Sequence, residues 1–145
     1  MERNGGFLIT KIKQLGDRIF EKILSAKNID AFNGPQGRIL YVLWHSDGIS
    51  IKTLSDRCGL AVTSLTTMLE RMERQQLIER VQSPSDKRKT LLYLTEKTRE
   101  LKNDYDSVSS QMSEIYYRGF SDEEIVQFEA YLQRVLKNLG EWQES

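Results

Sequence analysis

The sequence predicts a mainly α-helical protein that carries one small β-hairpin. Apolar residues recur at the three- and four-residue spacing of amphipathic helices over most of the chain. Residues 77–94 instead contain two strand-like runs around a polar turn. A length of 145 residues suits one compact domain with its own core, and we therefore expect a single unit over residues 1–145.

Two helices open the chain. The first, residues 8–27, has a continuous apolar stripe along one side. Asn33, Gly34 and Pro35 then form a helix-start signal, because proline fits the first turn of a helix. The helix that follows, residues 36–45, is apolar on most of its surface, so we expect it near the centre of the fold.

Two short helices joined by a tight turn come next, a pattern typical of a helix-turn-helix. Ser50 is placed to cap the first helix, which ends at Gly59. The second helix covers about residues 62–75. Its expected inward face consists of Val62, Leu65, Leu69 and Met72.

The hairpin follows directly. Residues 77–81 and 90–94 are the expected strands, and the turn between them carries three consecutive cations, Lys87, Arg88 and Lys89. A hairpin with a basic tip attached to a helix-turn-helix is a wing. We expect Asp86, beside these cations, to order the wing by pairing with a nearby arginine.

Two long helices complete the prediction, over residues 96–117 and 121–142, with Thr95 as the expected cap of the former. Ser121 and Glu124 form a capping box at the start of the latter. That helix has an apolar heptad seam, suited to packing against another helix. We expect a homodimer whose interface includes Leu8, Ile12, Ile125, Phe128, Leu132, Val135 and Leu139. Residues 33–95 would form the DNA-binding part, and residues 1–30 and 96–145 the dimerisation part.

The helix-turn-helix and the wing together suit duplex DNA, because a helix fits the major groove and a wing reaches the flanking backbone or minor groove. The candidate DNA-binding residues are Ser50, Thr63, Ser64, Thr66, Thr67, Arg71, Arg74, Lys87, Arg88 and Lys89. The alternative is that the polar helix face and the basic turn are merely solvated. A further alternative is a winged-helix module that binds only proteins.

Four segments together resemble the MarR family of bacterial transcription regulators. They are Leu54-Ser55-Asp56-Arg57-Cys58-Gly59-Leu60, the helix segment 65–73, Ser83-Pro84-Ser85-Asp86-Lys87-Arg88, and Leu94-Thr95-Glu96-Lys97. The resemblance implies a dimeric winged helix-turn-helix repressor with a helix in the major groove and Arg88 in the minor groove. It also implies a response to a small aromatic or anionic effector. The chain departs from the family pattern at Thr98 and at Gln75-Gln76, where glycine is frequent.

Other residues give weaker signals. The lone cysteine, Cys58, is better interpreted as a buried small side chain than as a redox sensor. The lone histidine, His45, suits a helix end or the wall of a ligand cavity, and the candidate pocket residues are Ile19, Tyr41, Trp44 and His45. No metal-ligand spacing, cofactor fingerprint or catalytic motif is visible, so we expect neither a metal nor a cofactor nor an enzyme.

The charge appears at first to oppose DNA binding, because 21 Lys and Arg balance 21 Asp and Glu. Divided by segment, residues 1–50 sum to +2, residues 51–95 to +3 and residues 96–145 to −5. A basic DNA-facing half is therefore compatible with a neutral total. The sequence shows no targeting or membrane-spanning segment, and we expect a soluble cytoplasmic protein.

Overall fold

The computed structural model describes residues 1–144. The chain forms two compact units, Met1–Ser109 and a second that begins at Ser110. The first unit contains the predicted helix-turn-helix and the wing. The predicted division into a DNA-binding and a dimerisation part remains a prediction.

Helices α1 (Gly5–Ala26) and α2 (Gly34–His45) begin slightly earlier than expected. At the start of α2, Asn33 Oδ1 accepts a hydrogen bond from the Gln36 N–H at 2.8 Å, and Gln36 Oε1 accepts one from the Asn33 N–H at 3.1 Å. This capping box was not predicted. Ile39, the first large apolar residue of α2, is fully buried, as are Leu40 and Leu43, which confirms the central position of this helix.

The helix-turn-helix consists of α3 (Ile51–Cys58) and α4 (Val62–Arg74). Ser50 Oγ caps α3 by accepting a hydrogen bond from the Thr53 N–H at 3.2 Å, and Gly59 ends it in the left-handed conformation. The predicted inward face of α4 is buried at Leu65, Leu69 and Met72. Val62 is the exception, because its side chain is 48% exposed at the first position of the helix.

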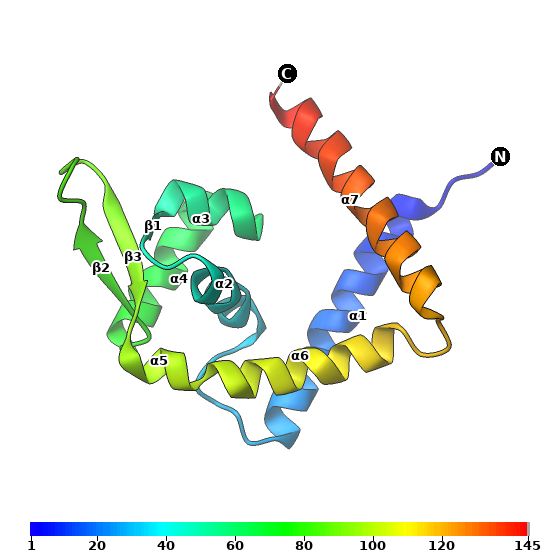
Figure 1. The fold of residues 1–145 in the computed structure, drawn as a ribbon, viewed down its shortest axis with the longest axis horizontal. Helices are drawn as coiled ribbons and strands as arrows, with labels where there is room; N and C mark the ends of the chain where they lie inside the picture. Colours follow the sequence, from blue (N-terminus) through cyan, green and yellow to red (C-terminus); the bar gives the residue numbers. More distant parts are fainter. Residues whose placement is uncertain (145) are drawn as a thin grey trace. The chain divides into compact units, whose positions relative to one another are not determined.

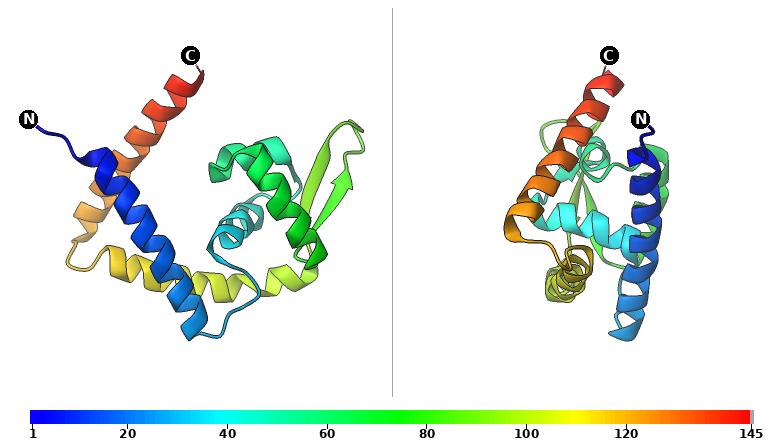
Figure 2. Two further views of the ribbon diagram at one scale, coloured as in Figure 1. Left: turned by 180° about the vertical axis from the view of Figure 1, so that it is seen from behind. Right: turned by 90° about the vertical axis from the view of Figure 1, so that its right-hand side faces the viewer.

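The wing belongs to a three-stranded antiparallel sheet with the order β1-β3-β2. Strand β1 (Ile49–Ser50) pairs with β3 (Thr90–Leu94), which pairs in turn with β2 (Ile78–Gln82). The β2–β3 hairpin projects beyond α3 and α4 in Figure 1 and in the left-hand view of Figure 2. Two residues carry no periodicity, so β1 was not predicted.

The turn before β1 depends on Gly48. Its φ is +74°, and its N–H donates to the Leu92 carbonyl at 2.8 Å. A Cβ at this position would lie 2.8 Å from Cε1 of Tyr93. Only glycine combines this backbone conformation with so close an approach of the ring.

The predicted single helix over residues 96–117 was wrong, because the chain forms α5 (Glu96–Glu100) and α6 (Lys102–Tyr116) instead. The Thr98 carbonyl accepts from the Leu101 N–H at 3.1 Å and from the Trp44 indole N–H at 3.3 Å. These two bonds replace the regular helical bond at this point. Thr95 occupies the N-cap position without capping, since its hydroxyl instead donates to the Gln76 carbonyl at 2.7 Å.

The second unit contains the end of α6 and helix α7 (Asp122–Glu144). The predicted capping box is present, with the Ser121 N–H donating to Glu124 Oε1 at 2.8 Å and the Glu124 N–H to Ser121 Oγ at 3.2 Å. Phe120 and Phe128 pack edge to face at 6.2 Å between ring centroids. None of the described α7 side chains is buried. Within residues 1–144, no helix is both long and apolar enough to cross a membrane.

Candidate nucleic-acid interface

The outward face of α4 is a polar stripe. Thr63, Thr67, Glu70 and Arg74 follow one another at intervals of four, three and four residues, which places them on one side of the helix, and all four are exposed. Neither the Thr63 nor the Thr67 hydroxyl forms a hydrogen bond with another described residue. We call these four residues the α4 stripe.

The other predicted α4 residues lie beside this stripe. The hydroxyl of Thr66 donates to the Val62 carbonyl at 2.8 Å, so its proton is already used within the helix. Arg71 is exposed and lines a groove of about 390 Å³ with Glu21 and Gln36 among others. Ser64 is exposed on the same flank as Arg71.

The start of α4 also leaves backbone donors available. Ala61 holds the N-cap position and makes no side-chain cap hydrogen bond. The N–H groups of the first turn therefore lack a side-chain acceptor there. Such groups, at the positive end of the helix dipole, suit a phosphate oxygen.

The wing tip presents Arg88 to solvent. Its side chain is 90% exposed, and its Nε and Nη2 donate to the two carboxylate oxygens of Asp86 at 3.1 and 3.3 Å. The Arg88 backbone N–H also donates to Asp86 Oδ1 at 3.1 Å. The hydrogen bond from the Arg88 side chain is the main cause that holds the pKa of Asp86 below its ordinary value. An exposed pair adds little stability, but it sets the direction of the guanidinium.

The turn that carries these cations is held by its own polar side chains. The Ser83 N–H donates to the Lys89 carbonyl at 2.9 Å, and Gln82 Nε2 donates to the Lys87 carbonyl at 2.7 Å. Ser83, which is only 6% exposed, also receives a hydrogen bond from the Asp86 N–H. Lys87 and Lys89 remain exposed. Sequence reasoning missed Ser83 and Gln82, because serine and glutamine are unremarkable in a polar turn.

Strand pairing brings the start of α3 to the base of the wing. Ser50 lies opposite Leu91 in the β1–β3 ladder. A groove of about 370 Å³ results, lined by Ser50, Ile51, Lys52, Thr53, Arg88, Lys89 and Thr90. The Ser50 hydroxyl is occupied by Thr53, to which it donates at 3.0 Å. Sequence reasoning missed Lys52, although a cation in the first turn of α3 was a visible signal.

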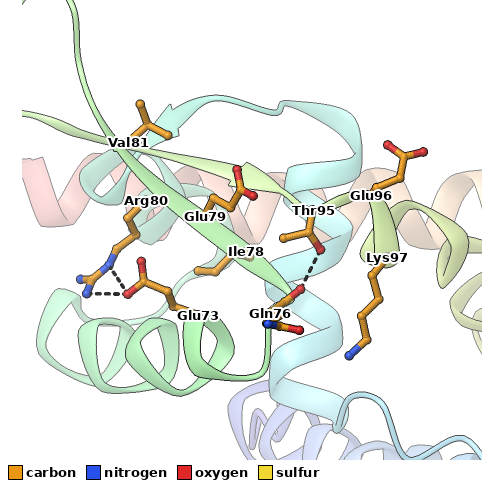
Figure 3. A pocket seen from close by; sticks show the side chains of 9 residues that line it. All are labelled: Glu73, Gln76, Ile78, Glu79, Arg80, Val81, Thr95, Glu96 and Lys97. Atoms are coloured by element: carbon orange, nitrogen blue, oxygen red, sulfur yellow. Dashed lines mark hydrogen bonds and ion pairs between the residues drawn. The ribbon is translucent and has the colours of Figure 1, made fainter.

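A third groove lies behind α4 and is unsuited to phosphate. It has a volume of about 610 Å³ and is lined by the end of α4, by β2 and by the start of α5 (Figure 3). Its charged residues are three carboxylates, Glu73, Glu79 and Glu96, against Arg80 and Lys97. The Arg80 Nη2 atom lies 3.0 Å from Glu73 Oε1, so this arginine is already paired. The cations available for DNA are therefore those of the wing, Lys52 at the start of α3, and Arg71 and Arg74 on α4.

Three of the four predicted pocket residues, Tyr41, Trp44 and His45, belong to a cluster of aromatic rings. Trp44 and Tyr41 lie 5.3 and 5.8 Å from the ring of Tyr105, measured between centroids. Burial is the main cause that raises the pKa of Tyr105. The ring of His45 packs at a tilt against that of Tyr41, with 4.5 Å between centroids, and its Nδ1 lies 2.8 Å from the Tyr41 carbonyl oxygen. Ile19 is half-buried.

The lone cysteine lies in the core of the fold. Cys58 is 9% exposed at the end of α3, in keeping with a buried small side chain. In the described part of the chain, no group of three or more His, Cys, Asp or Glu residues is placed to hold a metal ion.

Comparisons with known proteins connect this chain with the MarR family. The model of the MarR family matches residues 32–90, which cover the helix-turn-helix and most of the wing. These residues, together with the fold, support a MarR-family winged-helix protein. The transcriptional regulator MgrA of Staphylococcus aureus is 29% identical over 114 residues, covering 76% of this chain and 74% of MgrA. TtmR of Methylorubrum extorquens is 36% identical over 72 residues, half of this chain but only 37% of TtmR.

The fold is shared with MarR of E. coli. A cysteine mutant of that protein, solved in complex with operator DNA, superposes with a TM-score of 0.80 at 25% identity. The match covers 90% of this chain and 92% of that one. The predicted fold class is thereby confirmed. MarR-family proteins are transcription regulators and not enzymes, and the chain shares that class.

Proposed function

We propose that this protein is a homodimeric, sequence-specific DNA-binding regulator that acts as a repressor. The α4 stripe would enter the major groove of each half-site, while Arg88 would contact the flanking backbone or minor groove. The observation that carries this proposal is the combination of that exposed polar stripe with a 90% exposed wing arginine. The likeness to a protein solved with operator DNA supports it.

Exposed apolar side chains support the homodimer. In the predicted interface, Leu8 is 51% exposed on α1 and Leu139 is 63% exposed on α7. Ile12, Phe128, Leu132 and Val135 are also exposed, whereas Ile125 is half-buried. So much apolar surface is typical of an association site. A two-fold dimer would bind a pseudo-palindromic operator with half-sites about 10 base pairs apart.

The aromatic cluster supports a response to a small aromatic or anionic effector. The exposed rings of Tyr41 and His45 offer stacking and hydrogen-bonding surfaces beside Trp44. A ligand that orders this region would alter the end of α2, which directly precedes the sheet and the helix-turn-helix. We place the protein in the cytoplasm, because its proposed partner is the genome.

The test is binding to the DNA upstream of its own gene, by footprinting and then by salt titration. A DNA binder loses affinity with a log–log slope of about −0.9 per phosphate neutralised. Arg88→Ala should weaken operator binding about tenfold and reduce the slope by about one phosphate. Arg118→Ala, which removes an exposed cation from the turn after α6, is the matched control and should change neither quantity.

Two results would contradict the proposal. Absence of duplex binding even at low salt would favour a module that binds only proteins. If Arg88→Ala leaves both the operator affinity and its salt slope unchanged, the wing does not contact DNA through Arg88.

A further inference from the structure

Glu70 lies in the middle of the α4 stripe, where a negative charge is unexpected. It follows Thr67 by three residues and precedes Arg74 by four, so all three share one side of the helix. The side chain is exposed. If α4 enters the major groove, this carboxylate enters with it, between two rows of phosphates.

Within residues 1–144, the carboxylate of Glu70 forms no ion pair and accepts no hydrogen bond. Arg74 stands at the spacing of a helical ion pair, yet no nitrogen of it lies within 4.0 Å of Glu70. The contrast is Glu73, one turn along the helix, whose carboxylate is held by Arg80 at 3.0 Å. Glu73 is neutralised and turned toward β2, whereas Glu70 keeps a free charge on the α4 stripe.

A free carboxylate at a DNA interface needs a donor. Leaving it desolvated without one is costly, and the surrounding phosphates repel it. A carboxylate is an acceptor only. In the major groove, guanine presents acceptors at N7 and O6 and thymine one at O4, while exocyclic amino groups are found only on cytosine N4 and adenine N6.

We infer that Glu70 is a specificity-determining residue that accepts a hydrogen bond from an exocyclic base amino group in each half-site. Cytosine is the favoured base, because adenine carries its N7 acceptor beside the amino group and would repel the second carboxylate oxygen. Guanine or thymine in the same place would face the carboxylate with an acceptor. This inference rests on the proposed function, since it requires α4 in the major groove.

The experiment compares wild type with Glu70→Ala on a set of duplexes. Each duplex carries one base-pair substitution, made symmetrically in both half-sites of the footprinted operator, and a random-sequence duplex is measured at the same salt. Glu100→Gln, which removes an exposed carboxylate from α5, is the matched charge control. Alanine is a strong helix former, so the thermal midpoint of Glu70→Ala should not fall and folding should not confuse the result.

The wild type should lose about tenfold or more in affinity when the base pair read by Glu70 is replaced by one that presents an acceptor. Glu70→Ala should lose that preference at this position alone and bind the parent operator less tightly. The same variant should bind random DNA severalfold more tightly, because one repulsive charge is gone. Whether cytosine or adenine is preferred in the wild type identifies the amino group.

Three outcomes would overturn the inference. If Glu70→Ala binds operator and random DNA more tightly by the same factor, Glu70 acts only as a repulsive charge. If Glu70→Ala binds every duplex as Glu100→Gln does, Glu70 is only a solvated side chain. If Glu70→Ala loses base preference at several positions of the operator, the substitution has tilted the helix in the groove. A wild type that binds no duplex refutes the proposed function itself and is distinguishable from all three.

Discussion

Thr98 provides the sharpest stability test, because its side chain is fully buried and its hydroxyl has a defined task. The hydroxyl donates to the carbonyl oxygen of Leu77 at 2.5 Å, linking α5 to the residue before β2. Without it, that carbonyl retains only long contacts from the Thr95 N–H at 3.3 Å and the Thr95 hydroxyl at 3.4 Å. Thr98→Val keeps the side-chain shape and removes the donor.

The expected cost follows from two terms. The net contribution of one hydrogen bond is about 1 kcal/mol, and a buried acceptor left poorly satisfied costs about 1–3 kcal/mol. We expect Thr98→Val to lower the free energy of unfolding by about 2 kcal/mol. Thr98→Ser is the control, since it keeps the hydroxyl and loses one buried methyl group, at a cost of about 1 kcal/mol.

Urea unfolding followed by circular dichroism measures the difference. At a slope of about 2 kcal/mol per molar urea, the midpoint of Thr98→Val should fall by about 1 M, with an unchanged slope. All proteins must be compared at one concentration, because dimerisation adds to apparent stability. If the valine variant is as stable as the serine variant, the hydroxyl contributes nothing and the reasoning fails.

Three more outcomes are expected. Gly48→Ala should lower the free energy of unfolding by about 2 kcal/mol in urea, because it strains a φ of +74° and sets a Cβ 2.8 Å from an aromatic ring. Gly140→Ala is the control and should not lower it, because nothing lies within 4 Å of the new Cβ. Leu132→Glu should convert a dimer to a monomer in light scattering and weaken operator binding, whereas a wild type that is already monomeric contradicts the interface. The hydrogen bond to Glu129 raises the pKa of Tyr117 to about 12, so this contribution to stability is present below pH 10 and is lost as pH rises through 12. Tyr117→Phe should remove the latest phenolate transition from an absorbance titration, and a retained transition would refute the assignment.

The sequence was most informative where structure is locally encoded. Ser50 and Gly59 mark the two ends of α3 by cap chemistry, and the wing strand Thr90–Leu94 was predicted to the residue. The break at Leu101 was not predictable in this way, because the indole of Trp44, more than 50 positions away, supplies one of the bonds that cause it. Long-range pairing likewise creates β1 from two residues that carry no signal of their own.

The candidate DNA interface likewise contains residues that local sequence predicts and residues that only long-range contacts bring together. Helical spacing was enough to place Thr63 and Thr67 outward on α4, and adjacency in sequence was enough to suggest that Asp86 meets Arg88. Lys52 enters the site only because β1 pairs with β3. Glu70 gives no signal of a phosphate contact, because it is an acid, although its spacing places it among the residues that face outward.

The neutral net charge, finally, is not evidence against DNA binding, because the acidic residues of the C-terminal segment have local tasks. Asp122, Glu123 and Glu124 occupy the first turn of α7, where the helix dipole favours negative charge. Glu124 also completes the capping box, and Glu129 holds the hydroxyl of Tyr117 at 2.6 Å. Screening confines exposed charges to about 8 Å at physiological salt. The affinity for phosphate therefore depends on the cations around the wing and α4, and replacing the acids of α7 with neutral residues should raise the isoelectric point while leaving the salt slope of operator binding unchanged.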